Sequence, residues 1–150
     1  MAEYSITYMG KLQAQQRPRH RMVVTKNGQI FSQTYEQKQS RDFKASLHLL
    51  AQDAVQKKNG KPLEGAVCLV LTIGVAMPQS MSKKQRALVE DGKLFPTKKP
   101  DVDNMLKAVM DALNGVVYFD DKQVVSVTVR KYYTEMDGLV VNVWEVNSEK

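Results

Sequence analysis

Apolar residues recur at helical spacing in two stretches of the chain, and capping and terminating residues predict a further helix between them. The longest predicted helix spans about 35–58, and Asn59-Gly60 ends it. A second helix follows Ser82, a favourable N-cap residue, and ends near 91–92. A third runs from about 103 to 114, where Gly115 suits the position after the last turn. The stripes expected to face the core are Phe43, Leu47, Leu50 and Ala54 in the first helix, and Leu106, Val109, Met110 and Leu113 in the third.

The remaining apolar segments are typical of strands. Residues 3–9 predict a short strand, and 21–25 and 29–33 flank Asn27-Gly28, which favours a hairpin with a type I′ turn. The Val-, Leu- and Ile-rich segment 65–77 predicts a central strand buried on both faces. Segments 123–133 and 139–146 predict an antiparallel pair. This order of elements predicts one α+β (mixed α/β) domain over residues 1–150, with a mixed sheet packed by helices.

The composition is that of an ordinary soluble globular protein, with 43% hydrophobic and 25% charged residues. The apolar run 66–77 is too short to cross a bilayer, and residues 1–11 lack the apolar core of a signal peptide. We therefore expect a cytoplasmic protein that does not associate with membranes. The single cysteine, Cys68, excludes an intrachain disulfide and is expected in the core.

The charge is distributed unevenly along the chain. The net charge is +6, and basic side chains gather at 11–26 and 83–99, whereas acids gather at 101–121. A basic surface favours polyanions, because each neutralised phosphate releases condensed counterions. The residues expected to contact a DNA backbone are Arg17, Arg19, Arg21, Lys83, Lys84, Lys98 and Lys99.

The acidic stretch carries the candidate chemistry. Asp101 and Asp103 follow Pro100, and in an extended segment they would point to the same side. Oxygen-only ligands of this kind suit Mg²⁺ or Mn²⁺. Lys107 lies one helical turn after Asp103, and the pair Asp120-Asp121 follows the helix closely enough for the chain to fold back on it.

Each of these residues also has a purely structural interpretation. Asp103 could cap the helix, or form an exposed i,i+4 pair with Lys107. Asp120 and Asp121 could be turn residues. The concentration of like charges exceeds what capping requires, but spacing alone leaves both the metal site and the structural interpretations open.

Three blocks in this region resemble the signature of the RusA family of Holliday junction resolvases. They are Lys99-Pro-Asp-Val-Asp-Asn-Met-Leu-Lys107, Asp111-Ala-Leu-Asn-Gly115 and Asp120-Asp-Lys-Gln-Val124. The resemblance is densest over 82–125 and extends to Gly10 and the basic segment 16–19. Met105 stands where leucine is common, a swap that conserves volume.

The resemblance implies a structure-selective endodeoxyribonuclease of bacteria or phages that cuts four-way junctions in DNA recombination and repair. It places the family's essential acids on Asp101, Asp103 and Asp121 as metal ligands, and its catalytic lysine on Lys107. It further implies Mg²⁺ or Mn²⁺ as the cofactor, with no small-molecule cofactor, and a homodimer on branched DNA. Asp111 and Asp120 match family positions without an assigned role, and Asp111 is expected either to pair with Lys107 or to face solvent.

Two other functions remain open at this stage. A non-catalytic protein that binds branched or single-stranded DNA would explain the charge but not the clustered acids. A metal-dependent enzyme on nucleotides or RNA would explain the acids. A Rossmann or P-loop enzyme is not supported, because no glycine-rich phosphate fingerprint occurs, and neither Cys68 nor the two histidines lie in a nucleophilic pattern.

Overall fold

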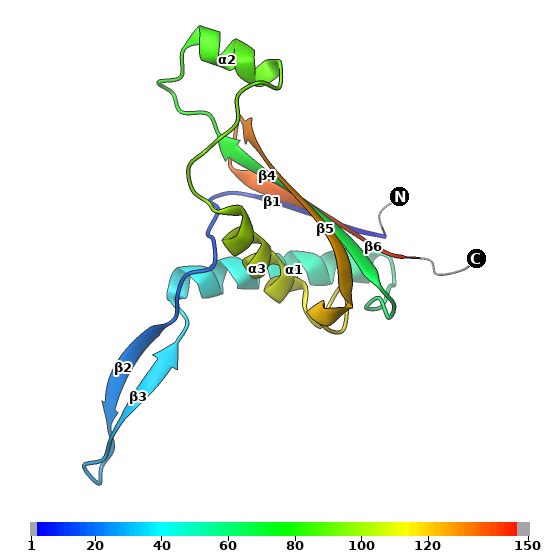
Figure 1. The fold of residues 1–150 in the computed structure, drawn as a ribbon. Coiled ribbons are helices and arrows are strands. Elements are labelled where there is room, and N and C mark those ends of the chain that lie inside the picture. The colour runs from blue at the N-terminus through cyan, green and yellow to red at the C-terminus, as the bar shows by residue number, and fades with distance from the viewer. Residues whose placement is uncertain (1–2, 147–150) are drawn as a thin grey trace.

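The main sheet has four strands, and helices cover one of its faces (Figure 1). The structure is a computed structural model that describes residues 3–146. The strand order is β1 (Tyr4–Met9), β6 (Gly138–Glu145), β4 (Val67–Ala76) and β5 (Val124–Thr134). β6 pairs antiparallel with both β1 and β4, and β5 pairs parallel with β4. The α+β class and the mixed sheet are therefore confirmed.

The helices differ in how they relate to this sheet. α1 (Lys38–Lys57) and α3 (Val102–Leu113) lie on the same face and contact each other, whereas α2 (Lys83–Glu90) lies beyond the end of β4 (Figure 1). β2 (Arg19–Val24) and β3 (Ile30–Tyr35) form a separate hairpin that projects away from the sheet. No helix within residues 3–146 combines the length and the apolarity that a bilayer span requires.

The core lies between the two helices and the inner face of the sheet. Along β4 the buried residues alternate with half-buried ones, because successive side chains of a strand point to opposite faces. The inward set is Val67, Leu69, Leu71 and Ile73, each at most 1% exposed. The prediction that this strand is buried on both faces is wrong, because helices cover only one face. Cys68 accordingly lies half-buried on the outer face and not in the core.

The predicted pairing of the last two strands is also wrong. β5 and β6 run in opposite directions, but β4 lies between them and forms ladders with both. The reason is the distribution of apolar residues: β4 is the most apolar strand and takes an interior position, whereas β5 carries exposed polar residues such as Ser126, Thr128 and Arg130 and occupies an edge.

The hairpin is confirmed, but its turn differs from the predicted type I′ turn. Gly28 N–H donates to Thr25 O, and Thr25 N–H donates to Gln29 O. Only Gly28 of the turn residues has positive φ, +82°, whereas a type I′ turn needs positive φ at both central residues. The connection is therefore a three-residue loop, in which a tight turn is followed by a left-handed glycine.

The helices begin and end close to their predicted positions. α1 starts at Lys38 because the chain up to Tyr35 is committed to β3. α2 has the predicted N-cap: Ser82 accepts from Gln85 N–H, and the Gln85 side chain accepts from Ser82 N–H. Gly115, at φ +79°, ends α3 as expected.

Two of the predicted core positions in α1 are less buried than expected. Phe43 and Leu47 are buried, but the stripe continues through Ala51 and Val55, because successive buried residues are four apart. Leu50 is 36% exposed, and Ala54 packs only at the edge of the core. In α3 Val109 and Leu113 are buried as predicted, and the partly buried Leu106 and Met110 flank them.

A matched pair of leucines in α1 tests the position of the core. Leu47 is 1% exposed and Leu49 is 65% exposed. We expect Leu47→Ala to lower the free energy of unfolding by about 2–5 kcal/mol, because it leaves a cavity in the core, and Leu49→Ala to change it by less than about 0.5 kcal/mol. Urea unfolding followed by circular dichroism measures both. Equal losses for the two variants would contradict the packing described.

Candidate active site

Asp101 and Asp103 lie at the N-terminus of α3 and are exposed. Asp101 is the N-cap residue, with extended backbone at φ −71° and ψ 141°, and its side chain makes no capping hydrogen bond. Asn104 Nδ2 donates instead to Asp101 Oδ2, at 3.3 Å. Asp103 is already helical, so the expectation that the two aspartates alternate along an extended segment is wrong.

Lys107 follows Asp103 by one helical turn and is exposed. Within residues 3–146 its ammonium group forms no salt bridge, so the structural interpretation of an i,i+4 pair with Asp103 does not hold in this structure. A lysine without a carboxylate partner remains available to a phosphate.

A buried tyrosine holds the second acidic pair beside the C-terminal end of α3. Tyr118 is fully buried, and its hydroxyl donates to Met110 O at 2.9 Å. Gln123 Oε1 accepts from Phe119 N–H and Asp120 N–H, which closes the turn that presents Asp120 and Asp121. Asp120 Oδ1 in turn accepts from Lys122 N–H at 3.0 Å. The turn role considered for Asp120 is therefore confirmed, whereas Asp121 has no such capping function.

The two neighbouring aspartates have opposite electrostatic character. The hydrogen bond from Lys122 N–H lowers the pKa of Asp120 below its ordinary value. The pKa of Asp121 is raised, mainly by desolvation. The hydrogen bond and the charge of Asp120 raise it further, as does the charge of Asp111. Desolvation and the same three carboxylates also raise the pKa of Tyr118, so its hydroxyl stays protonated and donates to α3. A nearby cation would therefore stabilise the ionised form of Asp121 more than that of Asp120, whose charge is already stabilised.

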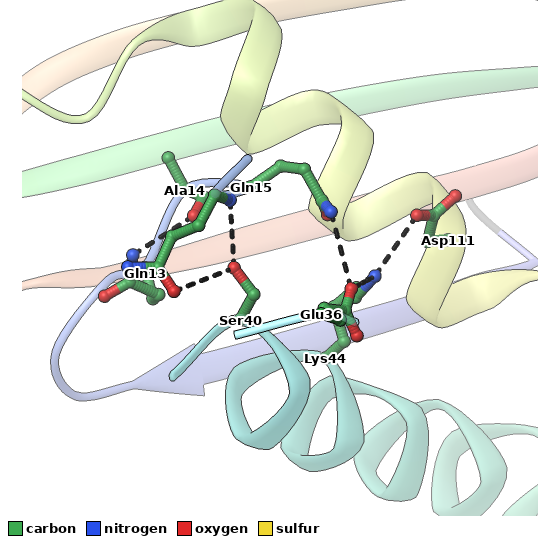
Figure 2. Close-up of polar contacts among 8 residues, drawn as sticks. Gln13, Ala14, Gln15, Glu36, Ser40, Lys44 and Asp111 are labelled. Carbon is green, nitrogen blue, oxygen red and sulfur yellow. Dashed lines mark hydrogen bonds and ion pairs between the residues drawn. The ribbon is translucent and has the colours of Figure 1, made fainter. Parts of the chain in front are cut away.

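Asp111 is held by a lysine that the sequence did not reveal. Lys44 Nζ lies 3.3 Å from Asp111 Oδ2 and also pairs with Glu36 (Figure 2). The alternative that Asp111 pairs with Lys107 is therefore wrong, because its partner comes from α1, whereas the alternative that it faces solvent is confirmed by its 51% exposed side chain. The Lys44 side chain is only 17% exposed, and its hydrogen bond lowers the pKa of Glu36. In the sequence, this role of Lys44 is indicated only weakly, by a charged residue that directly follows the core residue Phe43.

The donors present suit a hard divalent cation, although they do not form a closed site. Carboxylate oxygens dominate around α3, and Asp101, Asp103 and Asp121 have no salt-bridge partner among the described residues. Within residues 3–146, no three His, Cys, Asp or Glu side chains lie close enough together to hold a metal. Asp101 and Asp103 lie at the first turn of α3, and Asp121 lies beside Asp111 in its last turn. The donor chemistry fits Mg²⁺, whereas the three acids do not converge.

The basic residues predicted to contact DNA are exposed and come from three separate elements. Arg17, Arg19 and Arg21 lie at the base of the hairpin, Lys83 and Lys84 in α2, and Lys98 and Lys99 in the loop before α3. None of these seven forms a salt bridge within residues 3–146.

A further lysine, missed by the sequence analysis, holds the last of these loops. Lys131 Nζ donates to Lys98 O at 2.6 Å and to Pro100 O at 3.0 Å. It thereby ties β5 to the segment that leads into Asp101. Strand alternation could have revealed it, because Lys131 continues the inward-facing series of Val127 and Val129.

Comparison with known proteins identifies the family of the chain. The family model for endodeoxyribonuclease RusA matches residues 10–144, nearly the whole chain. The chain belongs to the RusA endodeoxyribonuclease family. It is also 37% identical over 144 residues to uncharacterized protein YqaN of Bacillus subtilis (strain 168), with 95% of this chain and 96% of YqaN covered. Membership in this family implies endodeoxyribonuclease activity.

The opposite pKa shifts of Asp120 and Asp121 predict opposite effects on stability. Folding raises the pKa of Asp121, so ionisation above that pKa destabilises the folded protein. In a metal chelator at pH 7 we expect Asp121→Asn to raise Tm, by on the order of 1 °C. The gain should vanish as the pH falls through the pKa of Asp121, where the wild-type carboxyl becomes neutral.

Asp120→Ala is the matched control for this measurement. The lowered pKa of Asp120 means that its carboxylate adds stability above the ordinary carboxyl pKa, which is lost as the pH falls through the folded-state pKa. We therefore expect a lower Tm for Asp120→Ala at pH 7. Scanning calorimetry from pH 3 to 8 measures both variants, and a lower Tm for Asp121→Asn at pH 7 would be inconsistent with the repulsion described.

Proposed function

We propose that this protein is a Mg²⁺-dependent, structure-selective endonuclease that resolves Holliday junctions and other branched DNA by paired nicks, in recombination and repair. The observation that carries the proposal is the exposed face of α3. Asp101, Asp103 and Lys107 project from its first two turns without salt-bridge partners among residues 3–146, and Asp121 lies beside its last turn. Membership in the RusA family supplies the reaction, cleavage within DNA.

The proposed roles follow from charge and position. Asp101, Asp103 and Asp121 would hold Mg²⁺, with Mn²⁺ as a possible substitute. When bound, the ion would lower the pKa of an attacking water and screen the phosphate charge. Because Asp121 lies beside the far end of α3, an ion held by Asp101 and Asp103 in this arrangement would take its remaining oxygen donors from water and the substrate phosphate.

Lys107 cannot ligate a metal while it is protonated. We assign its ammonium group to the scissile phosphate, where it neutralises the charge that develops in the transition state. The family resemblance implies hydrolysis to 5′-phosphate and 3′-hydroxyl ends. Tyr118 and Lys44 act as positioning residues: Tyr118 holds the turn with Asp121 beside α3, and Lys44 pairs with Asp111 on α3.

The seven exposed basic residues would bind the DNA backbone. They extend from the hairpin base through the loop before α3 to α2, on both sides of the acidic cluster (Figure 1). Contacts to phosphate provide affinity and register without reading sequence, which suits an enzyme that selects the shape of its substrate. A substrate of this kind places the enzyme with bacterial or phage DNA in the cytoplasm.

Cleavage of a labelled four-way junction in Mg²⁺ tests the proposed active site. We expect Asp101→Asn and Asp103→Asn to reduce cutting at least about 100-fold, because each removes a charged oxygen donor. Lys107→Met should have a comparable effect on cutting while junction affinity, measured by gel shift in Ca²⁺, changes less than about threefold. Undiminished cleavage by the aspartate variants would remove these residues from the site.

Two exposed residues at the far end of α1 provide matched controls. Asp53 and Lys57 pair with each other at 3.0 Å, distant in sequence from the site, and Asp53→Asn and Lys57→Met should cut at the wild-type rate. If the wild type binds junctions but never cuts them with Mg²⁺ or Mn²⁺, the protein is a non-catalytic branched-DNA-binding protein. Faster cleavage of RNA or free nucleotides than of a junction would identify the other candidate enzyme class.

Paired nicking also predicts the stoichiometry of the complex. A four-way junction has approximate two-fold symmetry, and each chain carries one candidate site, so we propose a homodimer with an isologous interface. We expect two protomers per junction in sedimentation velocity, and nicks in two opposing strands within one binding event on a cruciform plasmid. One protomer per junction, with a single nick per event, would rule out the paired mechanism.

A further inference from the structure

A groove of about 690 Å³ opens directly beside Asp101. One wall is the loop 11–17 that leads from β1 to the hairpin, and the other is the start of α3 with Lys99-Pro100. Its size is in the range of clefts that hold a small organic ligand, and a nucleotide is of this class. The groove is separate from the exposed face that carries Lys107, but it shares Asp101 and Asn104 with the candidate active site.

The groove is lined by side-chain amides that retain free hydrogen-bonding atoms. Gln13 Nε2 donates to Ala14 O, and Gln37 Nε2 donates to Arg17 O, which leaves Oε1 of both glutamines without a protein partner among residues 3–146. Gln16 Oε1 accepts from the buried Ser40 hydroxyl, and Gln16 Nε2 has no protein partner among residues 3–146. The groove therefore offers both donors and acceptors, and amide groups with both functions are suited to base edges.

Apolar and basic residues of the lining match the other parts of a nucleotide, and the groove also contains the carboxyl groups of Asp101 and Asp137. Leu12, Ala14 and Val75 provide an apolar surface on which a base can pack, and the cations at the rim are Lys11, Arg17 and Lys99. The apolar surface and the neutral amides are complementary to a base, and the basic rim residues are complementary to a phosphate.

The wall of glutamines is held in place before any ligand binds. Gln15 N–H donates to Asn104 O at 3.1 Å, which attaches the loop to α3. Gln16 N–H donates to Ser40 Oγ at 2.9 Å, and Gln15 Nε2 donates to Glu36 at 3.4 Å (Figure 2). Because a carboxylate only accepts hydrogen bonds, the orientation of the Gln15 amide is determined. A wall fixed to both α1 and α3 can discriminate between ligands, since little is spent on ordering it.

We propose that this groove is a base-reading subsite, in which Gln13, Gln16 and Gln37 recognise an unpaired base next to the phosphate that is cut. This inference rests on the proposed function, because it assumes that Asp101 marks the scissile position. It assigns to the loop 11–17 the choice of cutting sequence, whereas the exposed cations bind any sequence. Opened bases at the crossover of a junction would be free to enter the groove.

Cut-site mapping on junctions with randomised bases around the crossover tests the subsite. We expect the wild type to favour particular bases beside the cut. In Gln13→Ala and Gln16→Ala, cutting at the favoured sequence should fall about tenfold relative to other sequences, the loss typical for one base contact. Gln52→Ala, an exposed glutamine on α1 outside the groove, should keep the wild-type pattern. A wild type without base preference, or unchanged patterns in both groove variants, would overturn the inference.

A second measurement needs no cleavage. We expect 5′-phosphorylated DNA dinucleotides, titrated into isotope-labelled protein, to shift the side-chain amide resonances of Gln13, Gln16 and Gln37, with affinities that differ among base compositions. Shifts confined to Lys83, Lys84 and their neighbours would overturn the subsite. If the dinucleotides bind in the groove but no junction is cut, the proposed function fails and the subsite stands. If junctions are cut with the same pattern in all variants, the proposed function stands and the subsite fails.

Discussion

The orientation of α3 is the constraint on which the candidate site depends. One stripe of α3 is buried, with Met105, Val109 and Leu113 each at most 1% exposed. This stripe belongs to the same core cluster as the inward residues of β4 and Leu47 of α1. Burying this stripe accounts for much of the stability of the helix, because apolar area removed from water is the main favourable contribution to folding. It also leaves only one rotation of the helix open, so the polar residues at positions 103, 107 and 111 must face solvent.

Carboxylates concentrated on such a surface oppose folding unless something compensates them. The protein compensates part of this charge: Lys44 pairs with Asp111, and a backbone N–H stabilises Asp120. Asp121, which has the raised pKa, is left without a cation, as are Asp101 and Asp103 within the described residues. Local rules of stability are typically violated at functional sites, and the uncompensated acids here are those that the family resemblance assigns to catalysis.

The hairpin and α2 are the outlying parts of the DNA-binding surface that we propose around this cluster. The hairpin and α2 contribute little to the main core: no residue of β2, β3 or α2 is buried. They do carry many of the exposed cations, and they are attached to the body at either side of α3 (Figure 1). Polar contacts hold the joints between them, with Gln15 and Ser40 at the hairpin side and Lys131 at the loop that follows α2. An interaction surface can therefore extend well beyond the core while its position relative to Asp101 stays defined.

The sequence by itself determined the helices, most of the strands and the family. The helical stripes located α1 and α3, and the Ser82 cap located α2, to within a few residues. The motif around Asp101, Asp103 and Lys107 identified the family, because local spacing and residue type carry both kinds of information. Only the tertiary structure decided what those elements contact. It placed β4 between β5 and β6, left one face of the sheet uncovered, paired Asp111 with Lys44 and formed the groove beside Asp101. Each of these joins residues far apart in the chain, and no pattern along one segment records which distant segment will lie against it.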